Sequence, residues 1–260
     1  MESVSNKTIQ STQPGFLGRF SEFRSENDTD PAKEGLKKIY AKILNAIQTQ
    51  EGLPWYHAVN GALIESYEQA ISGQDPSPPL ECKKGCDFCC HLPVAINAPE
   101  AFSLAAIIDQ QPDAVRTRFL TAIRTAEKKA RGFSVGARWA AKIPCVFLAP
   151  DGACQIYSAR PYGCRTHHST SAKACEDDGK PKIRADFAVK ATSNLEAFMN
   201  ACRERGLATE FYEMNKALRI VLDRGTMRAA RAWLSGKDVL KDAICVVSAR
   251  SANRPAGEDA

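Results

Sequence analysis

Four cysteines stand within nine residues of this chain, in the stretch Cys82-Lys-Lys-Gly-Cys86-Asp-Phe-Cys89-Cys90, and His91 follows at once. A second group of four is more widely spaced, with about eight, nine and ten residues between successive members, too far apart for one compact metal-binding knuckle. Its members are Cys145, Cys154, Cys164 and Cys175. No other feature of the sequence constrains the fold as strongly as these two cysteine groups, if the fold brings them together.

The size of the chain argues against a disulfide framework. Its 260 residues are 44% hydrophobic, which is ample for a core that needs no cross-links. No stretch approaches the roughly 20 apolar residues of a membrane helix, and residues 1–20 lack the charged and apolar blocks of a secretory signal. We therefore expect a cytoplasmic protein without membrane contact, in which ten reduced cysteines favour metal binding or thiol chemistry.

The formal net charge of +5 counts every cysteine as neutral. Several basic residues lie beside the cysteines, and we expect part of the basic excess to offset the charge of metal-bound thiolates. They are Lys83, Lys84, Arg160, Arg165 and Lys173. No long basic run or basic–aromatic alternation is present, so we expect no nucleic-acid partner. A protein partner and the oligomeric state stay open.

Helical patterns occupy most of the chain. Apolar residues at helical spacing, together with proline and glycine at the ends of the patterns, predict a series of helices. Their approximate ranges are 30–52, 54–72, 99–110, 112–131, 160–164, 182–205 and 210–223, with others up to about 243. The first two predict a helical hairpin. The prolines between 73 and 80 predict a stiff connector into the first cysteine group.

Two short apolar segments, 143–148 and 154–157, flank Pro150-Asp-Gly and predict a β-hairpin. The predicted fold class is therefore mainly α, a helical scaffold around a cysteine cluster with one short β-hairpin. Residues 30–247 are predicted to form a single domain whose cysteine-cluster core spans 80–176. The polar ends, 1–29 and 248–260, are predicted to be disordered tails.

The spacing of the first cysteine group is typical of metal sites. Cys86-x2-Cys89 lets two sulfurs reach one ion from a tight turn. Cys82 lies four residues earlier, on the same face if that segment is helical. Adjacent Cys89 and Cys90 point in different directions, so a pair of ions or a multi-iron cluster suits them better than one ion. The two groups together supply eight sulfurs, enough for two sites of four ligands.

A free vicinal cysteine pair beside lysines would oxidise readily, so all eight clustered cysteines are predicted to be metal ligands. Cys202 and Cys245 lie on apolar helix faces and are predicted to be buried small hydrophobes. His91, His167 and His168 each remain open as a ligand, a hydrogen-bond donor to a thiolate, or a surface residue. His57 is predicted to be an ordinary helix histidine.

Residues 80–176 resemble a known bacterial family. The similar motifs are Cys86-Asp-Phe-Cys89-Cys90-His-Leu-Pro-Val, then Cys145-Val-Phe-Leu, then Cys154-Gln-Ile-Tyr-Ser-Ala-Arg-Pro-Tyr-Gly-Cys164-Arg. The family comprises zinc- or iron-chelating proteins, is named for its CxxCxxCC motif, and is also called the YkgJ-like cysteine cluster family. Its eight characteristic cysteines map onto the eight above. One departure is visible, because three residues rather than two separate Cys82 from Cys86.

The resemblance implies metal chelation, with a physiological role that is unassigned. A related branch, the flagellin lysine N-methylases, indicates that such a cluster can belong to an enzyme. The first hypothesis is thus a protein that holds an iron–sulfur cluster or zinc. The alternatives are an enzyme, either a protein lysine methyltransferase or an oxidoreductase, and a metal storage or delivery protein. The sequence contains no glycine-rich nucleotide loop and no convincing nucleophile–base pair, so no catalytic residue is predicted.

Iron–sulfur is favoured over zinc because of the number of thiolates. Eight thiolates on two zinc ions would leave a strongly negative core, whereas the irons of a cluster carry more positive charge to set against them.

Overall fold

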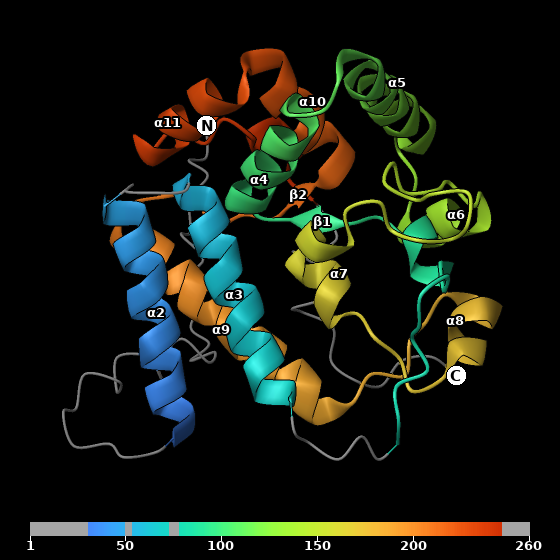
Figure 1. Cartoon of the computed structure of the whole chain (residues 1–260), viewed down its shortest axis with the longest axis horizontal. Helices are drawn as coiled ribbons and strands as arrows, with labels where there is room; N and C mark the ends of the chain where they lie inside the picture. The colour runs from blue at the N-terminus through green and yellow to red at the C-terminus, as the bar shows by residue number, and fades with distance from the viewer. Residues whose placement is uncertain (1–30, 50–53, 73–77, 246–260) are drawn as a thin grey trace, which may run out of the picture.

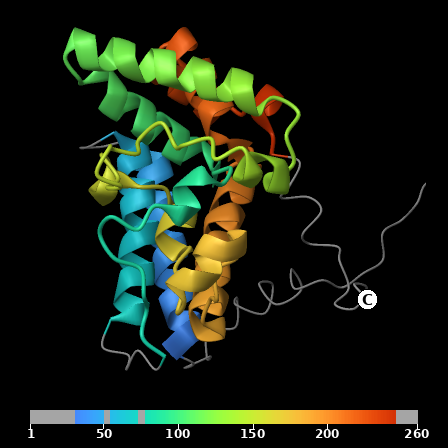
Figure 2. The same ribbon diagram turned by 90° about the vertical axis from the view of Figure 1, so that its right-hand side faces the viewer.

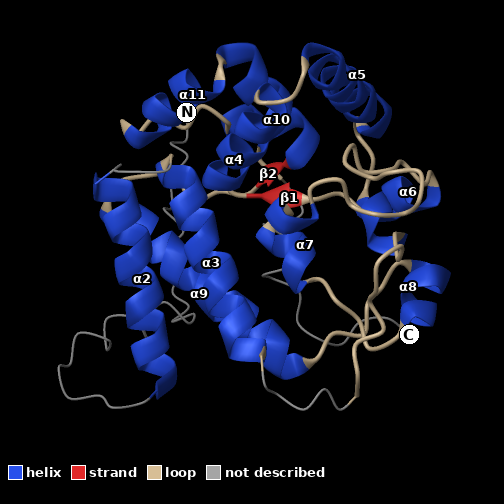
Figure 3. Ribbon diagram, in the orientation of Figure 1, coloured by secondary structure: helices blue, strands red, loops and turns tan. Residues whose placement is uncertain are grey.

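The computed structural model describes residues 31–49, 54–72 and 78–245. These residues are mainly helical and contain one two-stranded antiparallel sheet, which confirms the predicted fold class (Figure 3). The helices are α2 (Pro31–Thr49), α3 (Trp55–Ile71), α4 (Ala98–Asp109), α5 (Asp113–Ala130), α6 (Val135–Ala140), α7 (Tyr162–Thr166), α8 (Ala172–Asp178), α9 (Ala185–Glu204), α10 (Met214–Arg224) and α11 (Thr226–Leu234). The 3-10 turns are η2 (Phe88–His91), η3 (Tyr157–Ala159) and η4 (Lys241–Ala243). Both predicted tails lie outside the described residues.

The predicted long helices all form, within a few residues of the expected ends. Helices α2 and α3 pack against each other as the predicted hairpin, and α9 packs against both (Figures 1 and 2). Two short helices were not predicted. These are α6 and α8, and each begins with a serine whose hydroxyl accepts a backbone N–H bond, the usual cap for a helix start.

Helix α4 is almost completely buried and packs against α3, α10 and α11. Its start is fixed by a reciprocal capping box. The Asn97 side chain accepts from the Glu100 backbone N–H at 2.9 Å, and the Glu100 carboxylate accepts from the Asn97 N–H at 2.8 Å. The second oxygen of Glu100 accepts from the backbone N–H of Tyr162 at 2.5 Å. Glu100 therefore both caps α4 and ties it to the start of α7.

The sheet differs from the predicted hairpin. It pairs β1 (Ala95–Ile96) with β2 (Tyr212–Glu213), two segments far apart in the chain. The turn at 150–152 does form, but its flanks share only an isolated bridge between Leu148 and Cys154. The strands do not extend because the backbone N–H of Cys145 bonds instead to the carbonyl of Cys90, at 2.7 Å.

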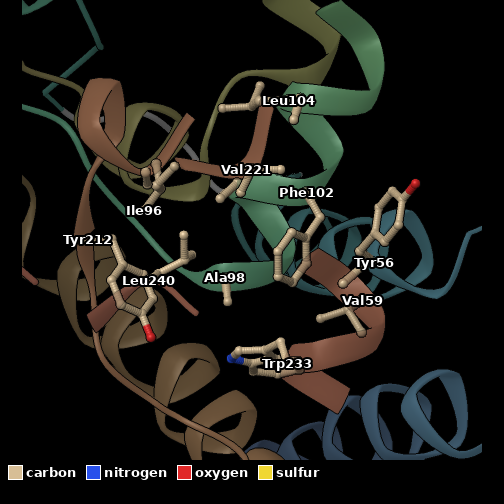
Figure 4. Close-up of a cluster of buried hydrophobic side chains, with 14 of the residues drawn as sticks. Tyr56, Val59, Ile96, Ala98, Phe102, Leu104, Tyr212, Val221, Trp233 and Leu240 are labelled. Carbon is tan, nitrogen blue, oxygen red and sulfur yellow. The ribbon is translucent and has the colours of Figure 1, made fainter. Parts of the chain in front are cut away.

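The hydrophobic core joins helices from both ends of the described chain (Figure 4). Trp233 of α11 is 1% exposed and stacks on Trp55 of α3, with ring centroids 5.5 Å apart. Phe102 of α4 meets both indoles edge to face. Because such aromatic side chains bury large areas, this cluster anchors α3, α4 and α11 to one another. Within the described residues, none of the helices has the length and apolar character needed to cross a bilayer.

Candidate metal centre

The two cysteine groups meet in space, as predicted. The Cys145–Cys90 backbone hydrogen bond joins them directly. A second contact lies between the Gly85 turn and the Gly152 turn, where a Cβ added to Gly152 would stand 2.8 Å from the Gly85 carbonyl oxygen. The loops that carry the cysteines therefore lie together, on the side of the molecule where α7 and α8 are seen in Figure 1.

One set of neighbouring thiols comprises Cys82, Cys86 and Cys175, with Cys89 at its edge. Burial raises the pKa of Cys82, and the nearby thiols of the other three add to the rise. Its sulfur accepts a hydrogen bond from the Ser169 N–H at 3.2 Å. Helix α8, which carries Cys175, packs against the η2 turn of the first cysteine group. This unpredicted helix is what brings Cys175 to the cluster.

A second set comprises Cys145, Cys154 and Cys164, again with Cys89 at its edge. Burial raises the pKa of Cys145 to about 11, and the Cys154 and Cys89 thiols contribute to the rise. The pKa of Cys164 is also well above its ordinary value, chiefly through burial and then through Cys145 and Cys89. Burial therefore favours the uncharged form of the Cys145 and Cys164 thiols.

The vicinal pair stands between the two sets. A side-chain hydrogen bond with Cys90 is the main cause that raises the pKa of Cys89, followed by burial. Cys89 is electrostatically coupled to Cys82 and Cys86 on one side and to Cys145 and Cys164 on the other. Cys89 thus lies next to thiols of both sets, with Cys90 as its hydrogen-bond partner.

Two arginines lie beside the thiols. Arg160 partly offsets the raised pKa values of Cys89 and Cys164. Arg138, which is 3% exposed, does the same for Cys145, and its Nε has no hydrogen-bond partner among the described residues. Arg160 was expected here from its position in the sequence. Arg138 was not, because it follows no spacing rule relative to the cysteines.

The expected role of Arg165 beside Cys164 needs correction. Its guanidinium donates to the Glu68 carboxylate at 2.6 Å and to the carbonyls of Tyr157 and Ser158. It therefore fastens α7 to α3 and to the η3 turn. Lys173 pairs with Asp177 at 2.5 Å on the surface of α8.

The histidines take different positions. His168 is 8% exposed, and its Nε2 lies 2.6 Å from the Tyr67 hydroxyl, so it is a core residue held by a hydrogen bond. Burial lowers the pKa of His167, whose Nε2 has no hydrogen-bond partner among the described residues. His91 ends the η2 turn and is half-buried. His57 lies on α3, where burial lowers its pKa.

The two remaining cysteines are buried, as predicted. Cys202 of α9 is 0% exposed within the hydrophobic core, where burial raises its pKa to about 12. Cys245 is 8% exposed near the end of the described chain.

The clustered thiols match zinc or iron in chemistry, since thiolates are preferred ligands of both. Their arrangement is not closed, because no three His, Cys, Asp or Glu side chains among the described residues are placed to hold an ion. A four-sulfur site needs sulfurs within roughly 4 Å of one another, so metal binding requires these side chains to reorient.

Comparison with known proteins bears on this cluster. Residues 81–203 match the family described as CxxCxxCC, putative zinc- or iron-chelating domain. No curated protein and no solved structure matches the chain. The match covers all eight clustered cysteines and also Cys202, which lies in the core. The central part of the chain, residues 81–203, is thus similar to the CxxCxxCC family of putative zinc- or iron-chelating domains.

Proposed function

We propose that this protein binds metal through its eight clustered cysteines, arranged as two sites of four sulfurs each. The observation that carries the proposal is the convergence of the 82–90 segment, the 145–154 turn, α7 and α8 on one place. The proposed ligands are Cys82, Cys86, Cys89, Cys90, Cys145, Cys154, Cys164 and Cys175. In a reducing, cytoplasmic setting these thiols stay available to metal.

The proposed division follows the electrostatic neighbours. Cys82, Cys86 and Cys175 take one sulfur of the vicinal pair, and the second set takes the other. Sulfurs on adjacent residues leave the backbone in different directions, which favours a division of the pair over joint coordination of one ion. The proposed second site takes its other three sulfurs from Cys145, Cys154 and Cys164. The first two lie on either side of the Gly152 turn, and the third lies on α7.

We favour iron–sulfur clusters as the metal. Eight thiolates around two zinc ions would carry a large negative charge. The iron ions of a cluster carry more positive charge than two zinc ions and so offset more of the thiolate charge. Two arginines lie beside the thiols, the half-buried Arg160 and the buried Arg138, which also pairs with Glu213 at 3.8 Å. Their positive charge supports a centre whose remaining negative charge the protein partly offsets. Cluster loading would also offset the cost of placing thiolates where burial disfavours charge.

The metal is identified by purification without oxygen, followed by a visible spectrum and elemental analysis. Brown protein with iron and acid-labile sulfide in similar amounts is expected. Colourless protein with stoichiometric zinc and no labile sulfide would overturn the iron–sulfur assignment and leave metal binding intact.

The division into two groups is tested by serine variants. Cys86→Ser alters the first group and Cys164→Ser the second, so each should remove about half of the bound metal, given that a site of this kind needs all four ligands. Cys202→Ser is the matched control, because it changes a buried cysteine of the core and should leave metal content unchanged. Complete metal loss from either ligand variant would indicate one joint site, and equal loss from Cys202→Ser would contradict the ligand assignment.

A further inference from the structure

A small cavity lies beside the proposed metal centre. It has a volume of about 180 Å³ and lies between α3, the first turns of α4, and residues 158–162. This last segment joins η3 to α7, and so connects Cys154 to Cys164. The volume is below the roughly 300–1,000 Å³ of sites for drug-sized ligands, so the cavity suits a molecule of a few non-hydrogen atoms.

The cavity is lined by Arg160, a cation that forms no ion pair with a carboxylate among the described residues. Arg160 lines it, packs its guanidinium 4.4 Å from the centroid of the Tyr157 ring, and leaves its buried Nε without a hydrogen-bond partner among the described residues. Glu100 also lines the cavity, and its two carboxylate oxygens accept the backbone N–H groups of Asn97 and Tyr162. A guanidinium in such a position is suited to a carboxylate.

Asn60, which also lines the cavity, offers an acceptor. Asn60 of α3 donates through Nδ2 to the Ser103 hydroxyl at 2.7 Å and to the Pro99 carbonyl at 3.1 Å. Its Oδ1 is buried and has no hydrogen-bond partner among the described residues. An unpaired acceptor of this kind is costly unless a ligand or water supplies a donor. Leu63, Ile64 and Leu104 provide apolar lining that accommodates a methyl or methylene group.

We propose that this cavity binds a small carboxylate that also carries a hydroxyl group, such as a short 2-hydroxy acid. The carboxylate would face Arg160, and the hydroxyl would donate to Asn60 Oδ1. The site does not depend on which metal the cysteines hold. Because the cavity is lined by residues 158–162, which lie between the proposed ligands Cys154 and Cys164, the bound acid would lie next to the metal centre.

The test compares lactate with propionate, which has the same carbon skeleton without the hydroxyl group. Binding to metal-loaded protein is measured by saturation-transfer NMR and by the concentration dependence of the unfolding temperature. Lactate is expected to bind about tenfold or more tightly than propionate, because propionate leaves the acceptor unpaired. Equal affinity for the two acids, or no binding of either at about 10 mM, a generous limit for so small a ligand, would overturn the proposal.

Two variants on different elements separate binding from metal retention. Asn60→Leu keeps the side-chain size, and it should reduce lactate affinity to that of propionate while metal content stays unchanged. Arg160→Gln should abolish binding of both acids, whereas Arg118→Gln, an exposed arginine of α5, should change neither. Metal content is measured for every variant. Unchanged preference for lactate in Asn60→Leu would overturn the proposal even if Arg160→Gln also loses metal.

Discussion

The contact between Gly152 and Gly85 offers a direct test of how the two cysteine groups are held together. Gly152 has a φ of +76°, and a Cβ added there would lie 2.8 Å from the Gly85 carbonyl oxygen. Ordinary contact begins at 3.4 Å, so Gly152→Ala must push the two turns apart by about 0.6 Å. Because these turns carry Cys86 and Cys154, the substitution acts on the proposed metal centre without changing a ligand.

The magnitude is the sum of two effects. A left-handed backbone costs an L-residue other than glycine roughly 1–2 kcal/mol. Forcing packed backbones apart costs about 1–3 kcal/mol more, as for other overpacked sites. We therefore expect Gly152→Ala to lower the free energy of unfolding by about 2–5 kcal/mol, a large share of the usual ~5–15 kcal/mol of a domain.

Gly206→Ala is the matched control. Gly206 also has a positive φ, +65°, but nothing lies within 4 Å of an added Cβ, so only the backbone cost applies. Denaturant unfolding should show a difference of about 1–3 kcal/mol between the variants, and metal content should fall only in Gly152→Ala. Equal destabilisation with equal metal content would refute the view that this contact joins the two cysteine groups.

Three further predictions concern α3 and α4. Burial raises the pKa of Glu100 from 4.5 to about 7, so the folded state binds its proton more tightly than the unfolded state does, and stability should fall as pH rises through this window. Relative to Glu100→Gln, the native protein should lose about 3 kcal/mol of unfolding free energy between pH 4.5 and 7, and a pH-independent difference would contradict this. Tyr67→Phe leaves His168 Nε2 without its partner at 2.6 Å, so unfolding experiments should record a loss of about 1–3 kcal/mol, and an unchanged midpoint would argue against the bond. Gly61→Ala adds a Cβ with nothing within 4 Å, and should stabilise helix α3 by about 1 kcal/mol in thermal unfolding.

The sequence by itself determined the main helices and the two cysteine groups, 82–90 and 145–175. Helical periodicity in the long helices depends on local residue spacing, so α5, for example, appears within two residues of its predicted limits. The cysteine motif of the matched family was also visible, because Cys86-x2-Cys89 and the vicinal Cys90 are local patterns. The buried state of Cys202 followed from its place on an apolar helix face.

Other features depended on contacts between distant segments, which no local pattern encodes. The pairing of β1 with β2 joins residues more than a hundred positions apart, and it replaced the hairpin expected at the Gly152 turn. Helix α8 is short and weakly patterned, yet it brings Cys175 to the cluster. The positions of Arg138 and Arg165 were likewise decided by packing, since a long side chain can reach several partners and the fold selects one. Local periodicity specifies each helix on its own. The residues that surround a buried charge or thiol are decided by the tertiary fold.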